Sequence, residues 1–529
     1  MKPRLSPVIL FFRLLIAIAL LFSLLWTNVS VQALPYVFVT PAGSGVTCSQ
    51  VAPCNLATGL SLIDPNGTLY AAAGTYTGSG NQVVLLDKTI YFLGGWDGSP
   101  IEDVVRDPAA YVSILDGQNE RRVITVSGSP AVTPIIDGWT IRNGNASGLI
   151  SQCHSFGATA GCGGGIYAFE AQPTITHNII ETNTAAVAGG NLFGAGGGVY
   201  IDNSAYAVIS GNIIRNNNSH KEGVGVGGGI YVYNSGIAID VSENEIYEND
   251  DYAATTFYNH SGTGMHIHNN SGPIQVRDNF VYNNNPLDEA YGGTVNLSTC
   301  SNSVVLEGNT ITDNYGMWGV VELNYSVAMI RQNTIINPGA QNGLFIFDTS
   351  AHFGTQAASI QNNIIAGHQD KNVFIQAYDD HDTRVQLSHN TLADAPYGLY
   401  IGANDVIVVV TFDRGITSGH NLTGIYSSGN PGISVTVTNS LFDANGLDCS
   451  PSILNVDPLT GDPWFTDPSA NNYHLRHGSA AIDRVASGGL AVDIDGDPRP
   501  FGIGTLAYDV GADEFIFSDF QFLPITQRP

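Results

Sequence analysis

Three carboxylates late in the sequence have the residue types and the spacing of a metal site. Asp493, Asp495 and Asp497 alternate in a D-x-D-G-D turn, and carboxylate oxygens at alternate positions suit Ca²⁺. The turn is not an EF-hand loop, because Pro498 and Gly504 stand where that loop has Gly and Glu. The sequence therefore predicts a calcium site, with an acidic turn that caps backbone amides as the alternative.

A second acidic run carries the residue types of acid–base catalysis. Asp379, Asp380 and His381 are consecutive, and close carboxylates can divide the work of protonating a leaving oxygen and activating water. We take these three as the candidate catalytic residues, with a solvated loop at a corner of the fold as the alternative. Residues 248–251 form a similar acidic loop, which has the same alternative.

Histidine and tyrosine side chains supply two further candidate sites, one for a metal ion and one for a ligand. His266 and His268 lie two apart, so on a strand they share a face, as two ligands of a transition metal would. No third ligand is evident, and a solvent-facing pair is the alternative. Tyr167, Tyr200 and Tyr231 each follow a run of glycines. They are candidate ligand-binding residues on a regular platform, with packing as the alternative.

A repeated phrase indicates the elements that must position these residues. It has a small or polar residue, Asn, two mostly apolar positions and a polar tail, as in residues 177–183 (HNIIETN) and 211–217 (GNIIRNN). The leading residues of the copies are Asn178, Asn212, Asn244, Asn279, Asn309, Asn333, Asn363 and Asn390. They lie 34, 32, 35, 30, 24, 30 and 27 residues apart. This period, with no helical pattern inside it, predicts stacked β coils.

The stacking explains the residue types of the phrase. We expect Ile179, Ile213, Val281 and Ile311 to form apolar columns inside the coils. Gly permits positive φ at corners, and Asn tolerates left-handed backbone and bonds nearby backbone groups. Stacked Asn side chains can also bond to one another from coil to coil. The repeated Asn is therefore interpreted as structural rather than catalytic.

These features resemble a known fold. The body is similar to a right-handed, single-stranded parallel β-helix of the pectate-lyase-like kind, and residues 71–76 (AAAGTY) resemble the entry into such a helix in bacterial surface proteins. Residues 472–483 (NYHLRHGSAAID), 493–500 (DIDGDPRP) and 508–514 (YDVGADE) resemble the choice-of-anchor Q domain of secreted bacterial β-helix proteins. The expected fold is an all-β solenoid with a short N-terminal cap and an irregular C-terminal domain.

The resemblance also sets the expected domains and the alternative function. We expect an N-terminal cap and first coils at 34–100, β-helix repeats at 101–445, the choice-of-anchor Q-like domain at 446–515 and a tail at 516–529. Hydrolases on this fold pair carboxylates, but of their further motifs only the paired Asp occurs here. Lyases on this fold use a basic residue near a bound uronate, for which Arg277 and Arg331 are the candidates; a surface Arg on a strand is the alternative.

The composition of the chain narrows the classes of molecule that it could bind. Charged residues make up 12% of the chain, and the formal net charge is −27, which opposes binding to nucleic acid and to anionic membrane surfaces. Cations such as Ca²⁺ and neutral glycans are compatible with this charge.

The first 33 residues predict export. Lys2 and Arg4 precede an apolar run, and Ala33 ends a small-residue cleavage pattern, so residues 1–33 read as a signal peptide that is removed before Leu34. An uncleaved membrane anchor is the alternative, although the run is short for a spanning helix. The mature chain contains no other segment that could span a membrane.

The six cysteines fit an exported protein with disulfides. Cys48 and Cys54 are close in sequence, as are Cys153 and Cys162, and we expect each pair to close a local loop. The sequence leaves open whether Cys300 and Cys449 pair or stay free.

Taken together, these patterns predict an exported, extracellular or cell-surface monomer. We expect a non-catalytic β-helix that binds glycans or other surfaces in adhesion or structure, with Ca²⁺ as its one cofactor. A polysaccharide lyase or glycoside hydrolase is the alternative.

Overall fold

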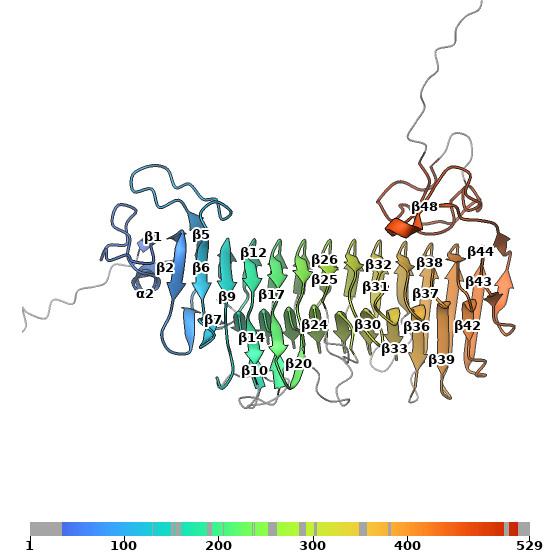
Figure 1. Cartoon of the computed structure of the whole chain (residues 1–529), viewed down its shortest axis with the longest axis horizontal. Helices are drawn as coiled ribbons and strands as arrows, with labels where there is room; N and C mark the ends of the chain where they lie inside the picture. Colours follow the sequence, from blue (N-terminus) through green and yellow to red (C-terminus); the bar gives the residue numbers. More distant parts are fainter. Residues whose placement is uncertain are drawn as a thin grey trace, which may run out of the picture.

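The chain winds into a long solenoid of parallel strands (Figure 1). A computed structural model describes residues 34–129, 131–149, 153, 160–187, 193–204, 206–234, 236, 238–251, 262–284, 292–300, 304–348, 357–378, 382–501 and 507–516. Within these residues three long sheets have 15, 14 and 13 strands. We call them sheet 1, which includes β17 (Tyr206–Ser210), sheet 2, which includes β18 (Ile213–Arg215), and sheet 3, which includes β16 (Val199–Asp202).

Each coil adds one strand to each sheet. After β16, β17 and β18, the next coil supplies β21 (Ile230–Tyr233), β22 (Ala238–Ser242) and β23 (Glu245–Tyr247) in the same order. Pairing is parallel and in register throughout this step. The prediction of an all-β parallel β-helix is therefore confirmed.

The core is a set of apolar columns, but not all of the expected residues lie in it. Ile180 and Ile214 are buried and pair across neighbouring coils, as do Val281 and Ile311. The expectation that Ile179 and Ile213 also face inward was wrong, because alternate residues of a strand face opposite sides, and these two face outward and are only partly buried. Two adjacent isoleucines do not reveal which of them faces inward.

Two ladders of buried Asn side chains run along the interior. Oδ1 of Asn212 accepts hydrogen bonds from the backbone N of Asn178 at 2.9 Å and from its Nδ2 at 3.1 Å, while Nδ2 of Asn212 donates to the carbonyl of Ile175 at 2.8 Å. The first ladder contains Asn178, Asn212, Asn244, Asn279, Asn309, Asn333, Asn363 and Asn390. The second contains Asn183, Asn217, Asn249, Asn284, Asn314 and Asn337. The expected coil-to-coil bonding of Asn is confirmed.

The left-handed residue of each corner precedes the ladder Asn. The residues before the first ladder all have positive φ: His177, Gly211, Glu243, Asp278, Gly308, Gln332, Asn362 and His389. The ladder Asn residues themselves are not in this region. The turn conformation is thus supplied by a position of variable type, and the Asn supplies the hydrogen bonds.

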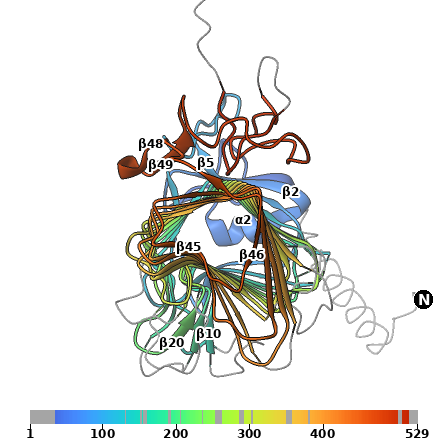
Figure 2. The ribbon, with the colours of Figure 1, turned by 90° about the vertical axis from the view of Figure 1, so that its right-hand side faces the viewer.

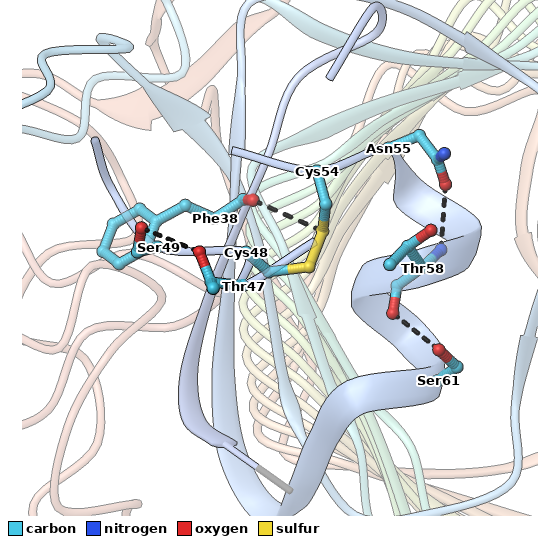
Figure 3. Close-up of a disulfide and its surroundings, with 8 residues drawn as sticks. All are labelled: Phe38, Thr47, Cys48, Ser49, Cys54, Asn55, Thr58 and Ser61. Carbon is cyan, nitrogen blue, oxygen red and sulfur yellow. Dashed lines mark hydrogen bonds between the residues drawn. A yellow bond between two sulfur atoms is a disulfide. The ribbon is translucent and has the colours of Figure 1, made fainter. Parts of the chain in front are cut away.

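The N-terminal end is closed by a short helix. In Figure 2, which views the solenoid along its axis, α2 (Leu56–Leu62) lies within the outline of the coils. Oδ1 of Asn55 accepts from the backbone N of Thr58 at 2.9 Å and caps the helix. Beside it, the disulfide between Cys48 and Cys54 closes a seven-residue loop whose Cα atoms are 4.7 Å apart at its ends (Figure 3).

The last coil extends beyond the expected domain boundary at residue 445. Strands β45 (Leu447–Cys449), β46 (Leu454–Val456) and β47 (Leu459–Thr460) still pair with the preceding coil. The chain then folds back over earlier coils, with the hairpin of β48 (Phe465–Asp467) and β49 (Asn472–Leu475) outside the solenoid (Figures 1 and 2).

Hydrogen bonds to side chains of earlier coils help to fix the described residues of this C-terminal region, 461–516. Nε2 of Gln332 donates to the carbonyl of Asp493 at 2.8 Å, and Nδ2 of Asn362 to that of Val492 at 2.7 Å. Tyr473 Oη donates to Asp394 at 2.8 Å. The backbone N of Ala512 donates to Thr391 Oγ1 at 3.0 Å. Among the described residues, no helix has the length and apolar character required to cross a bilayer.

Candidate functional site

The outer side of the corner between sheets 1 and 2 carries the best-defined candidate site. We call it the corner face: the last outward residues of the sheet 1 strands, the left-handed corner residues and the outward residues of sheet 2. The C-terminal region overhangs one part of this face, and the loop between β5 (Tyr91–Trp96) and β6 (Ser113–Asp116) overhangs another (Figure 1). A pocket lies under each overhang.

The C-terminal pocket has a volume of about 580 Å³. Its floor comes from three successive coils of the solenoid, and its wall from the C-terminal region. The lining residues are Arg277, Asp278, Glu307, Gly308, Asn309, Thr310, Gln332, Thr334, His474, Ile494 and Asp495. Most of them carry polar groups, so the pocket suits a hydroxyl-rich or charged ligand rather than an apolar one.

Arg277 of the floor and Arg331 of the next coil but one, on the same outer face, are held by carboxylates. Nη2 of Arg331 lies 2.9 Å from Oε2 of Glu307, and Nη2 of Arg277 lies 3.1 Å from Oδ2 of Asp240. The hydrogen bond to Asp240 raises the pKa of Arg277 above its usual range. More than a third of each arginine side chain is exposed. Each guanidinium therefore retains N–H donors for a ligand, while the paired carboxylate balances its charge.

An aromatic platform adjoins the pocket on sheet 2. It consists of Phe280 and Tyr282 on β26 (Phe280–Tyr282) and Tyr247 on β23. Ring centroids are 4.5 Å apart for Phe280 and Tyr282 and 4.7 Å apart for Tyr282 and Tyr247, with stacked geometry. Phe280 remains 42% exposed and pairs with Thr310 of the pocket floor. The platform and pocket are therefore continuous on one face.

Charged groups hold the platform rings at their hydroxyl ends. Tyr282 Oη donates to Glu245 Oε1 at 2.6 Å. Arg215 donates from Nη1 to Tyr247 Oη at 2.8 Å and from Nη2 to Glu181 at 2.7 Å. The first of these bonds, with Tyr247, is the main reason that the pKa of Arg215 is raised. The tyrosine rings are thus fixed by the bonds at their polar tips, while Phe280 stays partly exposed beside them.

The wall of the pocket includes two residues of the predicted calcium turn, in an arrangement that the sequence did not predict. Oδ1 of Asp493 accepts from the backbone N of Asp495 at 2.9 Å and of Asp497 at 2.8 Å, and Oδ2 accepts from the N of Glu514 at 3.0 Å. Asp493 is fully buried. It therefore caps backbone amides, which was the alternative to a metal ligand, and the calcium site stays a prediction.

Asp495 instead approaches His474 and Asp513. Nε2 of His474 lies 3.0 Å from Oδ2 of Asp495, and this hydrogen bond raises the pKa of His474 and lowers that of Asp495. Burial raises the pKa of Asp513 to about 6. One ligand atom from each of the three residues lies within 4.8 Å of the others.

The second pocket of the corner face has a volume of about 430 Å³ and lies under the loop between β5 and β6. There Arg106 is paired with Asp137, which also accepts from Thr176 Oγ1 at 2.8 Å and lies 2.8 Å from Nδ1 of His177. Burial would raise the pKa of Asp137, but the bonds from His177, Thr176 and Arg106 lower it. The group is a fixed carboxylate that is already paired.

The predicted tyrosine platform lies on sheet 3 and is covered. Tyr167, Tyr200 and Tyr231 stack at centroid distances of 5.5 and 5.6 Å, but their side chains are 6%, 0% and 1% exposed. They pack against Ala195 of β15 (Phe193–Ala195) and Val226 of β20 (Val224–Val226), strands of a small outer sheet. A glycan needs an open ring face. The burial of these tyrosines therefore favours packing, which was the alternative to ligand binding.

A buried polar cluster follows the tyrosines along sheet 3. His266 Nε2 and His268 Nδ1 lie 3.0 and 2.6 Å from Ser298 Oγ. On the next strands, Glu322 Oε2 accepts from Asn296 Nδ2 at 2.8 Å and from Asn324 Nδ2 at 3.0 Å. The histidine spacing correctly indicated a shared face. Asn296 ends a looser copy of the glycine phrase, residues 292–296 (GGTVN), at the position that Tyr231 holds in its own copy. Nothing in the sequence singled out Glu322 as its partner.

The acidic run and four of the cysteines are the other residues that the sequence singled out. Asp379, Asp380 and His381 lie outside the described residues, so the catalytic prediction stays a prediction. Cys153 and Cys162 are joined by a disulfide with Cα atoms 6.1 Å apart. Cys300 and Cys449 are free, the first buried and the second partly so.

Comparison with known proteins gives likenesses of fold alone. No known family model and no curated protein matches the chain, so the choice-of-anchor Q resemblance stays a prediction. The chain is similar to the solved structure of pectate lyase Pel9A, with 11% identity, a TM-score of 0.30, and coverage of 92% of this chain and 98% of that chain.

Two further solved structures are similar. For XylC in complex with xylose, identity is 8% and the TM-score 0.41, covering 91% of this chain and 98% of that chain. For the catalytic unit of the GH87 α-1,3-glucanase from Streptomyces thermodiastaticus strain HF3-3, identity is 12% and the TM-score 0.35, covering 82% of this chain and 70% of that chain. Likenesses this distant do not identify an activity.

Proposed function

We propose that this protein binds a neutral polysaccharide along its corner face. The observation that carries the proposal is the aromatic platform beside a polar pocket. A sugar ring has an apolar C–H face and a rim of hydroxyls, so it needs an open aromatic ring and hydrogen-bonding groups side by side. Phe280 supplies the open ring, and Arg277, Glu307 and Thr310 supply the polar groups next to it.

The geometry supports a chain of sugars rather than a single one. The platform and the C-terminal pocket follow successive strands, which stack about 4.8 Å apart in a parallel sheet. This spacing is comparable to the length of one hexose. Consecutive sugars can therefore meet equivalent positions on consecutive coils.

Charge supports a neutral ligand. The formal net charge of −27 repels polyanions at a distance. Three arginines at or beside the pocket and the platform, Arg277, Arg331 and Arg215, are paired with Asp240, Glu307 and Glu181. A polyuronate would have to compete with these carboxylates, whereas hydroxyls can accept from the N–H groups that remain free.

Binding can be tested by titrating neutral and uronic oligosaccharides into the intact protein in a calorimeter. Phe280→Ala should weaken binding at least about tenfold, the equivalent of roughly 1.4 kcal/mol. Tyr206→Ala is the matched control, because Tyr206 is an aromatic residue of 41% exposure on sheet 1, away from the platform. Absence of binding to any neutral glycan, or equal affinities in F280A and wild type, would overturn the proposal.

The same oligosaccharides test for catalysis. New reducing ends or unsaturated ends, lost in Asp495→Asn, would replace a binding role with polysaccharide cleavage at the corner face. Turnover lost in Asp380→Ala would place the catalysis in the predicted acidic loop instead. The proposal expects neither product.

We also infer that the protein is exported and acts outside the cell or at its surface. Two features support this: the signal-like pattern of residues 1–33, and two disulfides, which persist in oxidising compartments. N-terminal sequencing of protein recovered from the producing cells should find Leu34 first. Recovery of the intact N-terminus from the cytoplasm would contradict export.

A further inference from the structure

We propose that His474, Asp495 and Asp513 form a binding site for a transition-metal ion of the Zn²⁺ class at the wall of the C-terminal pocket. The three residues come from β49, the D-x-D-G-D turn and the segment that follows Tyr508, which meet through contacts inside the C-terminal region. One ligand atom from each lies within 4.8 Å of the other two. Zinc–nitrogen and zinc–oxygen bonds of about 2.0–2.2 Å separate two ligands by at most about 4.4 Å, so small side-chain movements bring all three onto one ion.

The histidine is oriented for ligation. Nδ1 of His474 lies 2.8 Å from Oδ1 of Asn472, and the same oxygen accepts from the backbone N of His474 at 3.1 Å. An amide oxygen can only accept, so Nδ1 carries the hydrogen. Nε2 then points at Asp495, 3.0 Å away. A ligating imidazole whose other nitrogen donates to an oxygen is the usual arrangement in metal sites.

The buried carboxylate is also oriented. Asp513 is 7% exposed, and its Oδ2 accepts from the backbone N of Leu475, next to His474, at 2.6 Å. This bond holds the carboxylate of Asp513 beside His474, and one of its oxygens lies within 4.8 Å of ligand atoms of His474 and Asp495. A cation shared by the three residues would balance the charge of the two carboxylates.

Asp493 holds the two acidic segments together without being a ligand. Its Oδ1 bonds the amides of the turn that carries Asp495, and its Oδ2 bonds the amide of Glu514, the neighbour of Asp513. Three ligands with one nitrogen favour a transition metal, because Ca²⁺ takes six to eight oxygens. Because His474 and Asp495 line the pocket, water or a sugar hydroxyl in the pocket could fill the remaining coordination positions. Only this last contact rests on the proposed glycan binding.

The experiment is metal binding by the whole chain, without any glycan. Protein stripped with a chelator is titrated with Zn²⁺, Co²⁺ and Ca²⁺, and bound metal is measured after equilibrium dialysis, together with the visible absorption of the Co²⁺ form. One Zn²⁺ per chain is expected. His474→Gln and Asp495→Asn should each weaken Zn²⁺ binding about 100-fold or more and alter the Co²⁺ spectrum. Both side chains are partly exposed, so these variants should fold, and circular dichroism checks this.

The matched control is Asp497→Asn, which changes the same turn outside the three ligands and should leave Zn²⁺ affinity within about twofold. Failure to bind Zn²⁺, or equal binding by wild type and H474Q, overturns the site. Binding of Ca²⁺ alone, lost in D497N, overturns it in favour of the D-x-D-G-D turn. Because F280A should leave the metal stoichiometry at one, loss of the glycan proposal and loss of the metal proposal are distinguishable.

Discussion

The two sides of one corner of the solenoid follow opposite rules. On the inside, the same residue recurs from Asn178 to Asn390, buried and hydrogen-bonded to its neighbours. On the outside, one residue earlier in the chain, the type changes from coil to coil while the left-handed backbone does not. The inner residue must form hydrogen bonds with the coils on both sides of it. The outer residue must only adopt the left-handed backbone conformation of the turn. Recognition can therefore vary on the outer side without disturbing the stack.

The largest test of this difference is the inner ladder. Asn279→Leu removes the acceptor of Asn244 and the donor to the carbonyl of Val241, which leaves several buried polar groups unpaired. We expect the free energy of unfolding to fall by about 3–5 kcal/mol, measured by urea denaturation. Asp278→Asn, the outer residue of the same corner, should change it by less than about 0.5 kcal/mol. Similar losses in both variants would remove the distinction between the two sides.

A somewhat smaller loss is expected where an outward position is covered. Tyr200 faces outward on sheet 3 but is fully buried in a stack, so Tyr200→Ala should destabilise the protein by about 3 kcal/mol. Glycan affinity, measured by calorimetry, should be unchanged. A loss of affinity with intact stability would restore Tyr200 as a ligand-binding residue and show that the corner face is not the recognition surface.

Acid should remove the stabilisation that depends on a buried neutral histidine. Burial lowers the pKa of His368 to about 4, below its usual value, so below pH 6.5 the unfolded chain takes up a proton that the folded chain does not. The stabilisation is complete above about pH 6.5, and the free energy of unfolding falls as the pH is lowered from there. Between pH 7 and 5 this loss amounts to about 2 kcal/mol. In pH-dependent urea denaturation, His368→Gln should reduce the acid loss by that amount, and an equal acid loss in H368Q and wild type would contradict the prediction.

The smallest effect is expected at an exposed corner position. Glu243 has φ of 56°, a region that Asn adopts more readily than Glu. Glu243→Asn should therefore raise the free energy of unfolding slightly, by up to about 0.5 kcal/mol. A clear destabilisation in thermal or urea unfolding would mean that the outer residues also carry structural constraints.

The sequence predicted the parts of the fold that are repeated. The spacing of the Asn residues gave the coils and the ladders, because stacking places equal residues at equal positions. It failed for Ile179 and Ile213, since either of two adjacent apolar residues can face inward. It left open whether Tyr200 binds a ligand or packs, because the short strands that cover it, such as β15 and β20, belong to an extra sheet that the repeated phrases do not indicate.

The candidate site was harder to predict because it depends on contacts between distant segments. Asp495 and His474 were both visible in the sequence, but Asp495 was grouped with Asp493 and Asp497, its neighbours along the chain. Folding of the C-terminal region itself brings Asp495 to His474. Its fold-back over earlier coils, fixed by bonds such as that of Gln332 to Asp493, brings both residues to the floor that contains Arg277 and Glu307. No local pattern encodes that docking.

The fold-back also determines how the protein would respond to mechanical force. Val510 to Ile516 do not lie at the open end of the solenoid, since the neighbouring Ala512 and Gly511 bond to Thr391 and Arg414. A pull applied through Ile516 should therefore load contacts spread over the coils from Gln332 to Arg414 before it can unwind the last coil, at Leu447 to Thr460, from the end of the solenoid.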